Sequence, residues 1–397
     1  MGKKITAAIA ALLWGLVLFC VLGAGALDLA LPKAISLLGT EELPSYPCIS
    51  FGTEEEEVTG FGSVATVKAK LFGVVSLKKI EVKKYENVSL IPGGMSFGVR
   101  LLGEGVCVVG LSEVTVGEKN ISPAALAGLS PKDIIIEVNG ERVRTVQDFK
   151  RSIATSEGKT LSLLCKRNGN TFTVSLTPVK DAEGQYTAGM WVRDSASGIG
   201  TVTFIDPSTG AFGALGHGIC DSGSGELLPL SRGIVTDAVV TGIEKGKKGA
   251  PGELKGYLKS EKKGVLDKNT VCGIFGYLID APKAEPIPIA LASKVHTGKA
   301  TIRCTLDDGV MREYEIEITE IHGQSENKSF TIKVTDEALL AKTGGIVQGM
   351  SGSPIIQNGK LIGAVTHVMV NDPTRGYGVF IENMLNQMDG KASQTQN

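Results

Sequence analysis

The sequence has almost no net charge, few aromatic residues and no closely spaced cysteines. Lys and Arg number 41 against 42 Asp and Glu, and no basic stripe with interleaved aromatic residues occurs. Nucleic-acid binding usually needs a basic surface, so this class of function is excluded. Aromatic residues make up 5% of the chain, whereas glycine occurs 51 times in 397 residues. This composition favours short strands and many turns over helical bundles.

The cysteines are scattered along the chain, without a CxxC motif or a Cys/His cluster at the spacing of metal ligands. We therefore expect no metal, no other cofactor and no disulfide framework, with most of the thiols free and buried. The cysteines are Cys20, Cys48, Cys107, Cys165, Cys220, Cys272 and Cys304.

One long apolar run stands at the N-terminus. Ile5–Leu27 contains no charge and is long enough to cross a bilayer as a helix. The preceding Lys3 and Lys4 predict that this end stays in the cytoplasm and that the rest is exported. We expect residues 1–29 to be a transmembrane anchor. The small residues Ala24–Ala26 leave a cleavable signal peptide as the alternative, and both interpretations place the body of the protein outside the cytoplasm.

Residues 30–90 are expected to form a small β-rich adaptor, because Val64–Val82 alternates apolar and polar residues as strands do. At the other end of the chain, the polar residues 391–397 are expected to be a disordered tail.

Residues 91–180 show a characteristic order of elements. Ser122 and Pro123 are suited to begin a short helix that Gly128 ends, and IIIEV then predicts a strand that turns at an Asn-Gly pair. A second helix is predicted over 145–153, followed by two strands. This order, and above all SPAALAGLSPKDIIIEVNGERV, resembles a bacterial PDZ domain, an α+β fold that adds an extended peptide to a sheet edge.

A PDZ domain holds the terminal carboxylate of its peptide with the backbone N–H groups of a loop. By position, Ser96, Phe97, Gly98 and Val99 resemble this loop. The alternative is a PDZ fold that serves only as a packing module or as a clamp within its own chain.

Residues 187–390 are rich in short strand-like runs. Asp206–Gly210 predicts a hairpin turn, and a strong helical signal lies in Asp336–Lys342, closed by Gly344. Many short strands over a stretch of this length indicate a β-barrel or a pair of barrels, so the whole chain is expected to be mainly β.

Gly344–Ile356, with the sequence GGIVQGMSGSPII, has the composition expected around a nucleophilic serine. Two apolar runs flank small residues, which leaves Ser351 exposed on a tight turn between strands. The N–H groups of Gly349 and Ser351 can then form an oxyanion hole that stabilises a tetrahedral intermediate. The alternative is a Gly/Ser turn without chemistry, and the presence of a base elsewhere decides between the two.

The chain has four histidines, of which His217 is the best candidate for that base. It lies between two glycines in GALGHGIC, at the end of a predicted hairpin strand, where its ring can project into a cleft. His296 and His322 lie in polar loops and are expected at the surface. His367 follows the serine in LIGAVTHVMV and is expected to be a strand or pocket-lining residue with satisfied hydrogen bonds.

GALGHGICD and GGIVQGMSGSPIIQNGKLIGAVTHVMVNDPTRGYGVFIENML together resemble the stage IV sporulation protein B peptidase family. Its members carry a membrane anchor, a PDZ domain and a chymotrypsin-like serine peptidase domain in this order. The likeness covers nearly the whole chain. It implies a double β-barrel with Ser351 as the nucleophile and His217 as the base.

The resemblance also implies a function in spore formation. Members of this family are exported to the space between the two forespore membranes, cleave themselves, and then cut a regulatory partner of an intramembrane metalloprotease. That cut releases the activation of a late mother-cell sigma factor. For this chain, the resemblance thus implies membrane attachment, self-cleavage in its own N-terminal region and a protein substrate.

The resemblance points to Asp336 as the acid that orients His217 and completes a catalytic triad. In chymotrypsin the acid lies in the first barrel, so Asp267 and Asp280 are alternatives. Asp336 can also act as the N-cap of the helix that it opens.

Two other functions compete with a serine endopeptidase. A periplasmic-type chaperone would expect a larger exposed apolar surface. A non-catalytic PDZ scaffold or sensor with a degenerate barrel would have no reason to keep both His217 and Ser351 in glycine-lined settings. A nucleophile at Cys220 is disfavoured, because its spacing from His217 usually points the two side chains apart.

Overall fold

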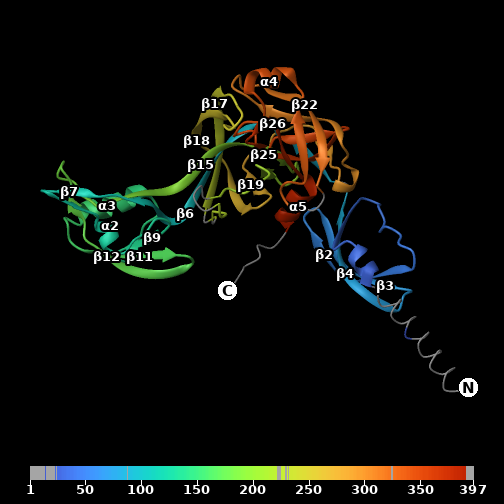
Figure 1. The fold of residues 1–397 in the computed structure, drawn as a ribbon, viewed down its shortest axis with the longest axis horizontal. Coiled ribbons are helices and arrows are strands. Elements are labelled where there is room, and N and C mark those ends of the chain that lie inside the picture. The colour runs from blue at the N-terminus through green and yellow to red at the C-terminus, as the bar shows by residue number, and fades with distance from the viewer. Residues whose placement is uncertain are drawn as a thin grey trace, which may run out of the picture.

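The computed structural model shows three lobes, which are a four-stranded sheet near the N-terminus, a pair of barrels and a PDZ lobe (Figure 1). It describes Trp14, Gly23 and residues 25–389, except for residues 87, 221–224, 229, 231, 323 and 324. Most of the apolar segment Ile5–Leu27 and the whole tail 391–397 therefore lie outside the described residues. Among the described residues, no helix is both long and apolar enough to span a bilayer.

The N-terminal sheet has the strand order β1-β4-β3-β2. β1 runs parallel to β4, and the other neighbours are antiparallel. Alternate residues such as Val67, Ala69, Ile80 and Val82 turn inward and form the core of this lobe, in line with the alternation of the sequence. The strands are β1 (Ala34–Leu38), β2 (Ile49–Thr59), β3 (Gly62–Leu71) and β4 (Val75–Tyr85).

The PDZ lobe lies at the opposite end of the molecule and contains both expected helices (Figure 1). Ser122 is the N-cap of α2, and Thr145 forms a capping box with Asp148 at the start of α3. The helices pack on the sheet β12-β11-β9-β6, beside the buried Asp133, which accepts two hydrogen bonds from Arg167. The elements are β6 (Ser96–Leu111), β7 (Val114–Val116), β8 (Lys119–Ile121), α2 (Pro123–Leu126), β9 (Ile134–Val138), β10 (Glu141–Arg142), α3 (Val146–Thr155), β11 (Leu161–Arg167), β12 (Asn170–Leu176), β13 (Val179–Lys180) and β14 (Tyr186–Thr187).

The first barrel shares two of its strands with the PDZ lobe. β6 and β15 pair from Leu111 with Met190 to Ser96 with Thr201, so one antiparallel ribbon belongs to both lobes. Six strands close the barrel in the order β6-β17-β18-β19-β16-β15, and the expected turn at Asp206–Gly210 joins β15 to β16. The further strands are β5 (Ser89–Pro92), β15 (Met190–Ile205), β16 (Ala211–Ala214), β17 (Arg232–Glu244), β18 (Glu253–Thr270), β19 (Gly273–Leu278) and β20 (Ile287–Pro288).

The second barrel is also closed by six strands, in the order β21-β22-β23-β26-β25-β24. Helix α4 begins after its N-cap Asp336 and ends at Gly344, in agreement with the sequence, whereas the C-terminal helix α5 was not predicted. The elements are η1 (Ala292–Lys294), β21 (Gly298–Thr305), β22 (Met311–Ile321), β23 (Phe330–Val334), α4 (Glu337–Thr343), β24 (Pro354–Gln357), β25 (Lys360–Met369), β26 (Asp372–Phe380) and α5 (Ile381–Asp389).

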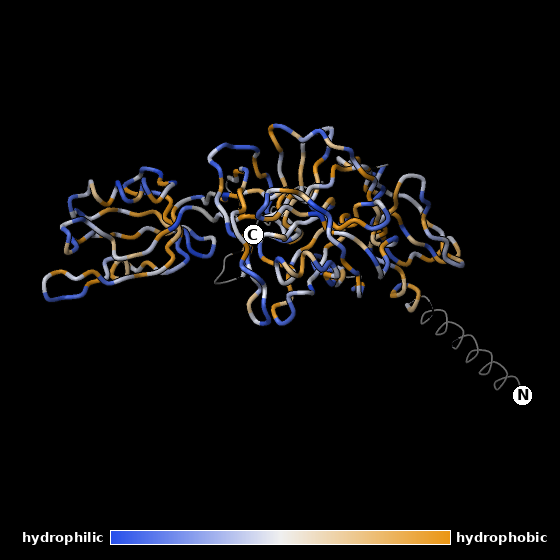
Figure 2. Tube along the Cα trace, turned by 90° about the horizontal axis from the view of Figure 1, so that it is seen from above, coloured by the Kyte–Doolittle hydropathy of each residue, from blue (hydrophilic) through white to orange (hydrophobic). Residues whose placement is uncertain are grey.

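The two barrels and the PDZ lobe confirm a mainly β chain with a pair of barrels. Figure 2 shows the physical basis, because the hydrophobic stretches follow the strands and hydrophilic residues gather at the turns between them. Each barrel has its own buried core, with Phe212 and Ile274 in the first and Ile302 and Phe330 in the second.

The assignment of Ser96, Phe97, Gly98 and Val99 to the carboxylate loop of the PDZ domain is wrong. These residues begin β6 in the first barrel, where Phe97 and Val99 are core residues and Gly98 pairs with Thr236. The chain does not turn back between SFGVRL and GVCVVG, as a PDZ hairpin would, but continues as one strand. Residues 96–99 therefore belong to the first barrel and not to the PDZ lobe.

In the PDZ lobe, one edge of β6 is paired with another strand of the same chain. Residues Met190–Arg193 of β15 pair there with Cys107–Leu111. A peptide cannot add to an edge that is already paired. β15 thus becomes the edge strand of the PDZ sheet, and among the described residues no strand pairs with its outer edge at Met190–Arg193.

Candidate active site

Ser351 and His217 line one cavity of about 450 Å³, formed by residues of both barrels. The serine lies on the turn between α4 and β24, and the histidine follows β16. The structure therefore brings together the two residues that the sequence singled out. The other lining residues are Val99, Ser197, Gly198, Ile199, Gly200, Leu215, Ile219, Pro251, Ile346, Val347, Gln348, Gly349, Thr366, His367, Val368 and Val370.

The turn around Ser351 leaves two N–H groups without acceptors. Among the described residues, the N–H groups of Gly349 and Ser351 donate no hydrogen bond, whereas that of Gly352 donates to Val365 O at 2.8 Å. Gly349 and Gly352 have φ values of 98° and 93°, and a Cβ on Gly352 would lie 2.0 Å from Thr201 O. The glycines thus permit a conformation that other residues rarely adopt, and it leaves the N–H pair free to bind an oxyanion.

The hydroxyl of Ser351 is hydrogen-bonded in this structure. Its Oγ donates a hydrogen bond of 2.8 Å to the carbonyl oxygen of Thr366 on β25. Attack on a substrate requires rotation about the Cα–Cβ bond, which would exchange this acceptor for the ring of the base. Sequence reasoning did not identify Thr366, because its role belongs to the backbone rather than to its side chain.

His217 has a defined tautomer. Its Nδ1 lies 2.9 Å from the carbonyl oxygen of Gly218, which only accepts, so Nδ1 carries the proton and donates it. Nε2 is then the free, unprotonated nitrogen that a general base needs. Burial lowers the pKa of His217, and the hydrogen bond to Gly218 opposes this shift. The ring is therefore neutral at physiological pH.

His367 lies directly beside the candidate base. The centroids of its ring and the His217 ring are 4.7 Å apart, with an angle of 35° between the planes. Its Nδ1 is buried without a hydrogen-bond partner, so His367 lines the pocket as expected but is not a fully satisfied histidine. Burial, followed by the charges of His217 and Lys328, lowers the pKa of His367 to about 4. Because His367 is neutral at physiological pH, it does not oppose the uptake of a proton by His217.

Asp336 does not meet His217 in this arrangement. One carboxylate oxygen accepts a hydrogen bond from the Leu339 N–H at 2.8 Å, and the other lies 3.4 Å from the Glu315 N–H. Asp336 is thus the N-cap of α4 and lies outside the cavity. In place of a carboxylate, the Gly218 carbonyl is the group that orients His217.

The alternative acids and the remaining histidines also lie outside the cavity. Asp267 and Asp280 are exposed, and no Asp or Glu lines the cavity among the described residues. His296 and His322 are both exposed as expected, and Nε2 of His322 lies 2.7 Å from the Thr331 hydroxyl oxygen.

The described cysteines form no disulfide bond with one another. Cys165, Cys272 and Cys304 are buried, whereas Cys48 and Cys220 are exposed. Cys20 lies outside the described residues. Within the described part of the chain, no group of three or more His, Cys, Asp or Glu side chains could hold a metal ion.

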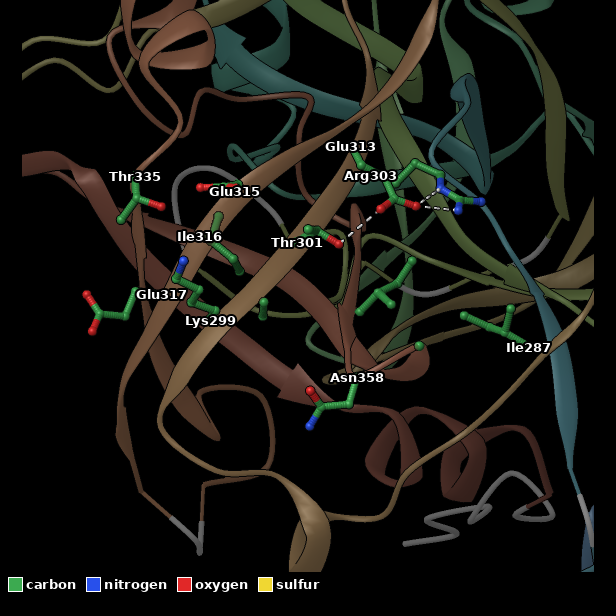
Figure 3. Close-up of a pocket in the computed structure, with 13 residues that line it drawn as sticks. Ile287, Lys299, Thr301, Arg303, Glu313, Glu315, Ile316, Glu317, Thr335 and Asn358 are labelled. Atoms are coloured by element: carbon green, nitrogen blue, oxygen red, sulfur yellow. Dashed lines mark hydrogen bonds and ion pairs between the residues drawn. The ribbon is translucent and has the colours of Figure 1, made fainter.

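A larger cavity of about 730 Å³ lies on the second barrel, and three of its polar side chains, Thr301, Arg303 and Glu313, are bonded to one another (Figure 3). Glu313 accepts hydrogen bonds from Arg303, one of them 2.5 Å long, and from the Thr301 hydroxyl at 3.3 Å. No serine, cysteine or histidine lines this cavity. It therefore lacks a serine nucleophile and a histidine base, and the cavity that contains Ser351 and His217 is the candidate active site.

Comparison with curated proteins yields short matches. A putative zinc metalloprotease of Mesorhizobium japonicum is 39% identical over 57 residues, which are 14% of this chain and 16% of that protein. Another of Clostridium perfringens is 28% identical over 69 residues, 17% of this chain and 21% of that protein. The chain thus spans about a fifth or less of the length of these relatives.

Two solved structures share low sequence identity with the chain. The PDZ domain of an SdrC-like protein from Listeria monocytogenes is 23% identical and covers 22% of this chain and 87% of its own, with a TM-score of 0.19. The active form of the Rv3671c protease from M. tuberculosis is 17% identical and covers 49% of this chain and 73% of its own, with a TM-score of 0.28.

Family models give the decisive match. The model of a PDZ domain matches residues 115–167, within the PDZ lobe. The model of the SpoIVB peptidase S55 family matches residues 184–385, just over half of the chain. This range contains Ser351, His217, the second barrel and every strand of the first barrel except β6. The chain therefore belongs to the SpoIVB peptidase S55 family and is a serine endopeptidase that carries a PDZ domain.

Proposed function

We propose that Ser351 is the nucleophile, that His217 is its general base, and that the N–H groups of Gly349 and Ser351 form the oxyanion hole. One observation carries this assignment. The two N–H groups without acceptors stand beside the serine in a cavity that also contains a histidine with a free Nε2. A nucleophile, a base and an electrostatic site for the developing charge are the parts that acyl transfer requires.

The reaction proceeds in two halves. Ser351 Oγ leaves Thr366 O and forms a bond to the scissile carbonyl carbon, while its proton passes to His217 Nε2. The carbonyl oxygen becomes negative and binds the two N–H groups. The C–N bond then breaks as the imidazolium returns the proton to the leaving amine. Water attacks the acyl-enzyme by the same route in reverse and restores the serine hydroxyl.

The Gly218 carbonyl takes part by holding His217. It accepts the Nδ1 proton in the resting state and stabilises the imidazolium when Nε2 is protonated. A neutral carbonyl stabilises a positive ring less than a carboxylate does, so this arrangement resembles a dyad more than a full triad. The proposal therefore assigns no role in proton transfer to Asp336.

The test is covalent labelling of the full chain with a fluorophosphonate probe. We expect the wild type to be labelled at one serine and Ser351→Ala to lose the label with an unchanged circular dichroism spectrum. Ser293→Ala, at an exposed serine outside the cavity, is the control and should be labelled like the wild type. Persistent labelling of Ser351→Ala would refute the nucleophile.

We further propose that the enzyme acts in spore formation. The SpoIVB family match and the apolar segment Ile5–Leu27 support a membrane-anchored peptidase whose body lies between the two forespore membranes. Its substrates would be its own N-terminal region and a regulator of an intramembrane metalloprotease, whose cleavage leads to activation of a late mother-cell sigma factor.

This role is tested in a sporulating host in which the chromosomal copy encodes Ser351→Ala. We expect the Ser351→Ala chain to accumulate uncut, the regulator to remain intact and the sigma factor to stay inactive. In a control strain with Ser293→Ala, self-cleavage, cleavage of the regulator and sigma activation should all be normal. Normal sigma activation in the Ser351→Ala strain would refute the role in sporulation without affecting the assignment of a serine peptidase.

A further inference from the structure

Thr201 on β15 contacts the nucleophile turn at two points. Its backbone N–H donates to the carbonyl oxygen of Ser351 at 3.0 Å, and its Oγ1 donates to the carbonyl oxygen of Gly349 at 2.8 Å. The residue is only 1% exposed. Both bonds reach from the first barrel to the second across a sequence separation of about 150 residues.

The two oxyanion N–H groups belong to peptide units that are themselves held by their carbonyl groups. Gln348 O accepts from the Leu254 N–H at 2.8 Å, and Met350 O accepts from the Ser353 hydroxyl at 2.7 Å. In a trans peptide the N–H points opposite to the C=O, so each of these bonds aims the next N–H in the chain. The N–H groups of Gly349 and Ser351 are aimed in this way.

The peptide unit between these two, which joins Gly349 to Met350, sets the angle between the two donors. Its N–H donates to Val347 O at 3.1 Å, and its carbonyl oxygen accepts from Thr201 Oγ1. Because Gly349 has no side chain, its φ and ψ are restrained mainly by such bonds. Loss of the hydroxyl would allow this peptide unit to rotate and the two donors to diverge.

We propose that Thr201 is a positioning residue of the oxyanion hole, acting through the Gly349 carbonyl. It does not line the cavity, so it acts on the donors and not on the substrate. This inference rests on the proposed role of the Gly349 and Ser351 N–H groups. A pre-aligned pair stabilises the transition state without a cost of reorganisation, which is the main advantage of an oxyanion hole over water.

The same strand provides a matched control. Thr203 is also fully buried, and its Oγ1 donates to the carbonyl oxygen of Gly352 at 2.8 Å. It contacts the same turn with the same chemistry and geometry, but beyond the serine. Thr201→Val and Thr203→Val thus each remove one buried hydrogen bond to the turn, and only the first affects the peptide between the two donors.

The experiment measures inactivation of the full chain by a fluorophosphonate, whose phosphoryl oxygen requires the same two donors. We expect Thr201→Val to lower the maximal inactivation rate by about 10- to 100-fold with little change in the half-saturating probe concentration. Loss of a whole oxyanion donor lowers kcat by about 10²- to 10³-fold, and misalignment should cost less. Thr201→Ser keeps the hydroxyl and should restore the rate to within about threefold of the wild type.

Melting temperatures separate positioning from folding. Both valine variants should melt lower than the wild type by similar amounts, because each leaves a buried carbonyl without its hydroxyl partner. Thr203→Val should nevertheless be labelled at the wild-type rate. Unchanged labelling of Thr201→Val, equal slowing of both valine variants, or failure of Thr201→Ser to recover would overturn the inference. If Ser351→Ala is also labelled, the proposed function fails instead, and the two failures are thus distinguishable.

Discussion

Asp336 offers a direct test of what the carboxylate does, since a helix cap and an orienting acid predict opposite results for two substitutions. In the structure Asp336 caps α4 through the Leu339 N–H. Asn is about as good an N-cap as Asp, whereas Ala removes the cap and costs about 1 kcal/mol of stability. In a domain of about 150–250 residues this loss lowers Tm by about 2–4 °C.

We therefore expect Asp336→Ala to melt at a lower temperature, Asp336→Asn to melt close to the wild type, and both purified variants to keep near-normal cleavage. An orienting acid of a triad would give the reverse pattern, because loss of its charge lowers kcat by about 10⁴-fold while the fold remains intact. The assay combines calorimetry with the rate of self-cleavage. A large loss of cleavage by Asp336→Asn at an unchanged Tm would refute the assignment of the Gly218 carbonyl as the group that orients His217.

Two further predictions concern the pH dependence and the substrate. Burial lowers the pKa of His217, and only the neutral ring can accept a proton, so the midpoint of the fall in cleavage at acidic pH should lie below the usual histidine pKa of about 6.5. A pH–rate profile with its midpoint at or above that value would contradict this expectation. The cavity is lined by no Asp, Glu, Lys or Arg, so peptides with an apolar residue before the scissile bond should have kcat/KM values at least about tenfold above matched peptides with Lys or Glu there. Equal values in a fluorogenic assay would exclude an uncharged specificity pocket.

Local signals in the sequence were sufficient for the individual elements. Caps and stops place α2, α3 and α4 to within two residues, and alternation indicates the strands of the barrels. Helix α5 was missed because no Ser, Thr, Asp or Asn stands before Ile381 to mark its start, although Gly390 follows its end. The helix is stabilised by burial of its apolar side chains, because Ile381, Met384 and Leu385 are fully buried in the neighbouring core.

The path of β6 could not be read from local signals. Phe97 and Gly98 fit a PDZ loop by spacing alone, but in the barrel a Cβ on Gly98 would lie 2.5 Å from Leu258 Cδ2. The glycine is thus required by strand packing rather than by a bound peptide. A bulky substitution there tests the barrel and not a PDZ ligand, because the residue that it meets is far away in the sequence.

Only part of the candidate site could be predicted from the sequence, because the rest depends on contacts between distant segments. Ser351, Gly349 and His217 stand in short glycine-lined motifs, and the chemistry of their side chains or N–H groups shows in the residue types. The groups that hold them do not show, since Gly218 and Thr366 act through carbonyl oxygens that every residue has. Such roles depend on distances that only the folded chain defines.

The shared ribbon explains why the PDZ lobe and the peptidase cannot be separated at a linker. β15 pairs with PDZ residues at Met190 and reaches the nucleophile turn at Thr201, only eleven positions further along the same strand. The register of the ribbon shifts between Arg193 and Ser195, where residues 103–106 of β6 have no partner on β15. On the barrel side of this bulge the pairs run from Ser195 with Leu102 to Thr201 with Ser96. The register of β15 against β6 therefore fixes the position of Thr201, from which its hydroxyl reaches the Gly349 carbonyl oxygen. A one-residue slip would turn the Thr201 side chain to the opposite face, so this part of the pairing also sets the geometry of the proposed oxyanion hole.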